Sequence, residues 1–169
     1  ENAIPILDSP EIEVIAPTAT VTATATATTT ATPTVTPTNT PYGEGVAEIT
    51  PGIVTAGSSG NVMVITYTNG ETQWASSPGY GTLKIRIPDG WSEPSRTNGQ
   101  PGYYTATING GVITYLGIDG MYIVIRARDL ISGGTITVTY GAGTGGGAIA
   151  QTNPGIAEFT VEMTASGDN

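Results

Sequence analysis

The sequence predicts an all-β protein, namely a Greek-key β-sandwich preceded by a long, extended N-terminal arm. Three observations support this prediction. From residue 44 onward, short runs of β-branched and aromatic residues alternate with polar residues. Turns rich in glycine, proline and asparagine separate these runs. Threonine occupies every even position from Thr18 to Thr40, and a period of two belongs to extended chain and not to helix.

Residues 1–17 contain one short segment with the pattern of a strand. Ile12 and Val14 share one face of this segment, whereas Glu11, Glu13 and Ile15 share the other. Prolines at positions 5, 10 and 17 exclude a long helix. Since the extended tract that follows carries this strand away from its own domain, we expect it to lack a partner there. It is therefore a candidate donor strand for a neighbouring copy, through Ile12, Val14 and Ile15.

Residues 18–43 form the predicted arm. The strict period of two places the threonine hydroxyl groups on one face and mostly alanine, valine and proline on the other. Threonine- and proline-rich segments of this kind are typical of glycosylated linkers, so we expect O-glycosylation and an intact mass above the 17.2 kDa of the bare chain. The candidate sites are Thr18, Thr20, Thr22, Thr24, Thr26, Thr28, Thr30, Thr32, Thr34, Thr36, Thr38 and Thr40.

Residues 44–169 form the predicted sandwich domain. Its candidate strands are residues 46–50, 61–68, 82–87, 103–108, 112–116, 121–127, 135–140 and 156–164. Alternation places Leu83, Ile85 and Ile87 in the core and Lys84 outside it. The dipeptide Asn109–Gly110, between two apolar runs, predicts a hairpin.

Two tryptophans lie in different sequence contexts. Trp91 follows a strand end and the turn Pro88–Asp89–Gly90, where a core position is expected. Trp74 and Tyr80 lie in the segment 70–81 between two predicted strands, so we expect them to be exposed and available for contacts with a partner.

The composition excludes several classes of function. The chain has 14 acidic and 5 basic residues, for a net charge of −9, which is unsuited to nucleic acid or to an anionic membrane surface. It has no cysteine and no histidine, so the usual zinc sites, thiol nucleophiles and histidine bases are excluded. No apolar run is long enough to span a membrane. We expect no metal site and no cofactor. No signal peptide is visible, and we expect that one has been removed to leave Glu1 as the mature N-terminus.

Three segments resemble the Ig-like β-sandwich repeat modules of prokaryotic extracellular surface proteins. They are residues 49–69 (ITPGIVTAGSSGNVMVITYTN), 83–91 (LKIRIPDGW) and 129–140 (DLISGGTITVTY). The resemblance implies an Ig-like sandwich and a role in stalks, adhesins or fibres, and it brings no catalytic residues. The chain departs from the usual pattern because it carries a single module.

Two functions remain open from the sequence. The first is a structural subunit of an extracellular filament or surface layer, secreted or on the cell surface, linked head to tail to copies of itself by the N-terminal strand. The second is a carbohydrate-binding or adhesive module on a glycosylated threonine- and proline-rich linker, with glycans as partners. An enzyme is not expected, because the carboxylates are scattered over turns and outward strand faces.

Overall fold

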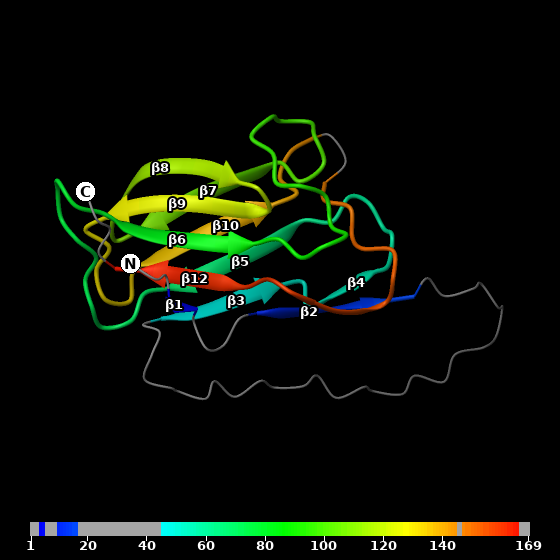
Figure 1. Cartoon of the computed structure of the whole chain (residues 1–169), viewed down its shortest axis with the longest axis horizontal. Helices are drawn as coiled ribbons and strands as arrows, with labels where there is room; N and C mark the ends of the chain where they lie inside the picture. The colour runs from blue at the N-terminus through cyan, green and yellow to red at the C-terminus, as the bar shows by residue number, and fades with distance from the viewer. Residues whose placement is uncertain (1–3, 6–9, 17–44, 145–146, 166–169) are drawn as a thin grey trace.

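A computed structural model of the chain describes residues 4–5, 10–16, 45–144 and 147–165 (Figure 1). The described residues form strands and loops without a helix, which confirms the all-β prediction. The predicted arm at residues 18–43 lies outside the described residues, so its extended form and its boundary remain predictions.

The strands belong to three sheets. The first has five strands, in the order β1 (Ile4–Pro5), β12 (Val161–Thr164), β6 (Gly81–Arg86), β9 (Tyr122–Arg128) and β8 (Val112–Asp119). The second has four, in the order β3 (Val46–Thr50), β5 (Met63–Thr68), β10 (Thr135–Tyr140) and β7 (Tyr104–Asn109). The third has three, in the order β11 (Gly155–Glu158), β2 (Glu11–Ile15) and β4 (Ile53–Thr55). All pairs are antiparallel except β2 with β4.

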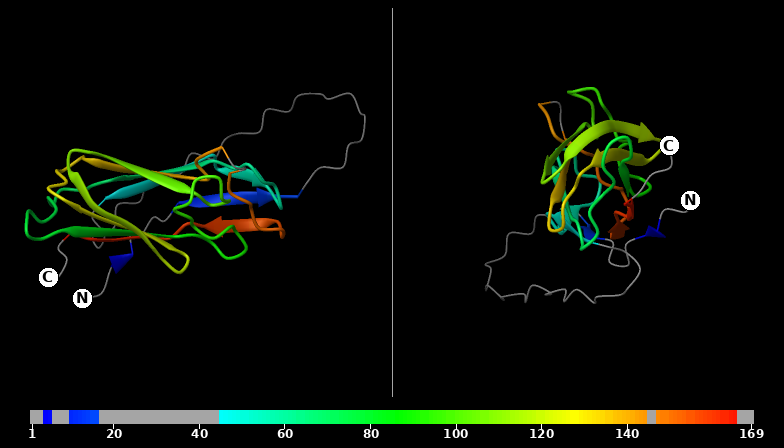
Figure 2. Two further views of the ribbon diagram at one scale, coloured as in Figure 1. Left: turned by 90° about the horizontal axis from the view of Figure 1, so that it is seen from above. Right: turned by 90° about the vertical axis from the view of Figure 1, so that its left-hand side faces the viewer.

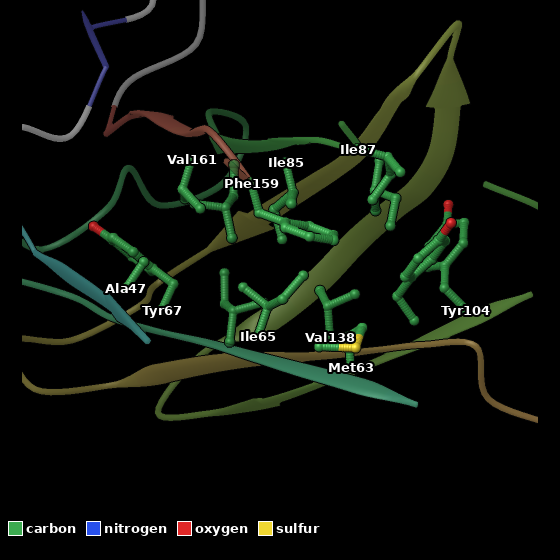
Figure 3. Packing of buried hydrophobic residues seen from close by; sticks show 14 of the residues in the cluster. Ala47, Met63, Ile65, Tyr67, Ile85, Ile87, Tyr104, Val138, Phe159 and Val161 are labelled. Carbon is green, nitrogen blue, oxygen red and sulfur yellow. The ribbon is translucent and has the colours of Figure 1, made fainter. Parts of the chain in front are cut away.

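The two larger sheets face one another across an apolar core, which gives the protein a sandwich-like architecture (Figures 2 and 3). The predicted alternation on β6 is confirmed, because Leu83, Ile85 and Ile87 are buried. Alternate residues of β10 and of the last strands are buried in the same way. Trp91 is also a core residue, as expected, and its ring packs against that of Phe159 with centroids 5.2 Å apart.

The predicted hairpin at Asn109–Gly110 is wrong. Asn109 ends β7, which pairs with β10, whereas Val112 begins β8, which pairs with β9 in the other large sheet. The turn therefore crosses from one sheet to the other. The two-residue hairpin lies instead at Gly120–Met121, between β8 and β9, where Gly120 has a φ of +57° that favours glycine.

The predicted strand at residues 156–164 is two strands with different partners. β11 pairs with β2, and β12 pairs with β6 and β1. Between them, the Phe159 amide donates to the Pro10 carbonyl and the Thr160 carbonyl accepts from Arg86. The short strand β4, which follows the Pro51–Gly52 turn, was not predicted. Both differences arise from the position of β2.

Candidate assembly site: the groove that holds strand β2

Strand β2 is the central strand of the three-stranded sheet, between β4 and β11, and the place that it fills between these two strands is here called the groove. β4 follows β3, an edge strand of the four-stranded sheet, and β11 leads into β12 of the five-stranded sheet. β2 therefore bridges the two larger sheets along one side of the molecule. The left view of Figure 2 shows β2, in blue, between the layer that contains β4 and the layer that contains β12.

Main-chain hydrogen bonds hold β2 on both sides. It pairs antiparallel with β11 and parallel with β4. Further bonds extend the contact beyond these ladders: the Glu13 amide donates to the Gly52 carbonyl at 2.8 Å, and the Ile15 carbonyl accepts from Ala56 at 2.5 Å. Because these bonds involve only the backbone, they do not depend on the side chains of β2.

The inward side chains of β2 complete the core. Ile12 and Val14 are 0% and 1% exposed. Ile12 lies opposite Ala157 on β11, and Val14 lies opposite Val54 on β4, both also buried. Burial of a side chain of this size stabilises the folded state by about 1.5–3 kcal/mol. The small Ala157 leaves room for the larger Ile12 beside it.

One outward side chain of β2 weakens the pairing of this strand with β11. Glu11 lies directly opposite Glu158, and both are exposed. Like charges at opposed positions of an antiparallel pair are destabilising. The next outward residue, Glu13, lies between Ile156 and Ile53 of the two neighbouring strands. The core side chains and the backbone therefore hold β2 in place against a repulsion at its outer face.

The expectation that this strand lacks a partner in its own domain is wrong. β2 pairs with β4 and β11 of the same chain, which the sequence pattern did not reveal because both partners are short and far away in the sequence. Of the three predicted donor residues, Ile12 and Val14 enter the groove, whereas Ile15 points outward and is 39% exposed. Strand donation to a second copy remains a proposal.

The predicted exposure of Trp74 is also wrong, since the side chain is 1% exposed. Its loop folds back onto the sandwich, with the Trp74 amide donating to the Leu130 carbonyl at 3.0 Å. The indole Nε1 donates to Asn69 Oδ1 at 3.0 Å, and the ring packs against Tyr67. Tyr80 is half-buried. The predicted glycosylation sites lie outside the described residues.

One cluster of surface residues was not predicted from the sequence. The Arg126 guanidinium carbon lies 4.8 Å from the centroid of the Tyr80 ring and 5.2 Å from that of the Tyr115 ring. These distances are typical of cation–π contacts. The three residues come from β9, β8 and the loop before β6, so only the strand register brings them together. From the sequence alone, the only indications of this cluster are an arginine at an outward position of β9 and a tyrosine two residues before Gly117.

Comparison with protein family models, with curated proteins and with solved structures finds no match. In the described part of the chain, no three acidic, histidine or cysteine side chains are grouped so that they could hold a metal ion. The same residues contain no helix that is long and apolar enough to cross a membrane.

Proposed function

We propose that this protein is a structural, non-enzymatic subunit of an extracellular filament or surface layer, with an Ig-like Greek-key body. In the assembly, β2 of one copy fills the groove between β4 and β11 of the next. The single observation that supports this proposal is the position of β2. It completes the core of the sandwich, yet only residues 17–44 connect it to β3.

The length of this connection makes exchange between copies feasible. Fully extended, residues 17–44 would span on the order of 90 Å at about 3.3 Å per residue, which is several times the length of the strands themselves. A strand from a neighbouring copy would make the same backbone bonds and bury the same Ile12 and Val14. Such swapping of an identical element is a low-cost route to assembly, and head-to-tail repetition gives an open chain.

The extracellular location rests on the composition. The chain has 24 glycines, 12 prolines, frequent threonine and almost no lysine, together with the alternating threonine tract. O-glycosylation of that tract would add bulk and solubility to the connection between copies. The adhesive alternative loses support because Trp74, one of its two candidate contact residues, is buried.

A peptide of residues 1–16 tests strand donation without any change to the protein. Added in excess to the assembling full chain, it should fill the groove without connecting two copies. We therefore expect filaments that shorten as the peptide concentration rises, measured by electron microscopy. The matched control is the same peptide with Ile12→Asn, which places an amide in the apolar groove and should leave filament length unchanged.

Two results would count against strand donation. One is a full chain that stays monomeric at every concentration and salt condition. The other is filaments of unchanged length in the presence of a peptide that binds them measurably.

A further inference from the structure

Exchange of β2 between copies does not by itself favour assembly, because the contacts made within one copy and between copies are the same. A strand supplied by another copy also competes with the chain's own strand, which is tethered to the groove and therefore has a raised effective concentration there. A stable filament therefore needs an additional contact between the bodies of two copies. The surface of the sandwich carries two patches that are suited to such a contact.

The first patch is the outer face of β11, β2 and β4, here called the isoleucine–glutamate face. Three large apolar side chains are exposed there: Ile15, Ile53 and Ile156, at 39%, 55% and 62%. Three exposed glutamates lie on the same face: Glu11, Glu13 and Glu158. Among the described residues, the ion pairs are Arg86 with Asp89 and Arg128 with Asp129. These glutamates therefore have no cationic partner within the described part of the chain.

The second patch is the outer face of β6, β9 and β8, here called the tyrosine–arginine face. It comprises Lys84, Arg126, Tyr80 and Tyr115. Lys84 and Arg126 are two of only five basic residues in the chain. Neither forms an ion pair with a described carboxylate, whereas Arg86 and Arg128 do. Lys84 does lie opposite Glu162 on β12, so Arg126 is the main cation of this face.

The tyrosine–arginine face is preorganised. A Cβ atom on Gly117 would overlap the Tyr115 hydroxyl group, so the tyrosine lies over the backbone of Gly117, where a side chain would exclude it. The Arg126 guanidinium group then lies close to the rings of both Tyr80 and Tyr115. Stacked arginine and tyrosine lose little conformational entropy on binding and are enriched where proteins contact one another.

We propose that the isoleucine–glutamate face of one copy docks on the tyrosine–arginine face of another. Each face offers exposed apolar area, and the unpaired glutamates of one complement the unpaired cations of the other. This contact deepens the proposed function and rests on it for the head-to-tail repeat, although its chemistry is independent of strand exchange.

The strands that carry the two faces lie in different parts of the molecule, since β8 and β9 are at the top of Figure 1 and β2 is at its base. One copy therefore engages two neighbours at once. An interface between two different faces repeats without closing unless the rotation between copies forms a ring. Each contact is small, but the same pair of copies is also linked by β2, so the two contacts reinforce one another.

Charge reversal tests this contact in the full chain. Arg126→Glu or Glu13→Lys alone places like charges opposite one another, and we expect self-association to weaken at least about ten-fold in sedimentation velocity. An equimolar mixture of the two variants should regain association, because every contact in an alternating assembly is then complementary. The control is Glu48→Lys, the same charge change at an exposed position on β3, with no effect expected.

Since all three altered residues are exposed, thermal unfolding should be unchanged. If Glu13→Lys lowers stability, Glu158→Lys replaces it on the neighbouring strand; that variant removes the repulsion from Glu11, so its stability should not fall. Failure of the mixture to regain association would overturn the proposed contact. If reversal has no effect but the peptide of residues 1–16 still shortens filaments, the docking of the two faces is wrong and strand donation stands. If reversal acts as expected and the peptide has no effect, strand donation fails and the two faces alone hold the copies together.

Discussion

At the scale of single residues, Asn69 is the polar centre of an otherwise apolar interior. It is 3% exposed and is the only polar or charged residue among the fully buried ones in the described part of the chain. Its Oδ1 accepts from the Tyr67 hydroxyl group at 3.1 Å and from Trp74 Nε1 at 3.0 Å. Its Nδ2 donates to the Leu130 and Ile131 carbonyl groups at 3.3 and 3.0 Å. One amide thus ties the loop after β5 to the loop before β10.

Replacement of Asn69 should be costly for this reason. In Asn69→Ala, buried donors and acceptors lose their partner, and we expect the free energy of unfolding to fall by about 2–4 kcal/mol. Urea denaturation monitored by tryptophan fluorescence measures the change. Asn153→Ala, at an exposed loop position, serves as the control and should change stability by less than about 0.5 kcal/mol. A similar small change for Asn69→Ala would show that the network contributes little.

The same residue explains why the exposure of Trp74 could not be predicted from the sequence. A tryptophan in a polar loop is typical of a contact residue, and nothing local distinguishes it from a core residue. Its burial depends on the side chain of Asn69, five positions earlier, and on the carbonyl of Leu130, far away in the sequence. The core position of Trp91, in contrast, follows from a local signal, because Trp91 directly follows a strand end and its turn.

At the scale of elements, the sequence predicts which residues of a strand face the core, but it does not predict which strands pair with one another. The inward residues of β6 and β10 follow from a period of two. The Asn109–Gly110 turn has the sequence of a hairpin, but the pairing of β7 with β10 and of β8 with β9 decides its geometry. In the same way, the pattern of β2 was recognised and its groove was not, since β4 has only three residues.

The docking of β2 has a consequence for the opposed pair Glu11 and Glu158. Glu158→Gln removes one of the two charges, so we expect the free energy of unfolding to rise by about 0.2–1 kcal/mol, with the gain shrinking as salt is added. Glu162→Gln is the matched control, because Glu162 lies opposite Lys84 and its loss should bring no gain. Equal stability of the two variants at low salt would indicate that β2 is not held beside β11.

At the scale of the whole molecule, the N-terminal strand belongs to the core although a long tract separates it from the rest of the sandwich. In this proposal, strand donation alone is energetically neutral, and docking of the complementary outer faces would provide the bias toward assembly. In the proposed assembly, a shared strand and a surface contact act together to associate copies of an acidic chain. The sequence pattern of residues 11–15 predicts strand donation, but it predicts neither the groove nor the two outer faces, because these depend on which strands lie side by side.

The most direct measurement asks which copy supplies β2 in the assembled protein. The chain has no cysteine, so Glu11→Cys with Glu158→Cys introduces a single pair of thiols at directly opposed positions. The Cα separation in such a pair suits a disulfide. After filaments are oxidised and denatured, we predict a ladder of covalent multimers, whereas each single-cysteine variant gives at most a dimer. Filaments that release only internally cross-linked monomers would contradict the account, because β2 would then stay in its own chain.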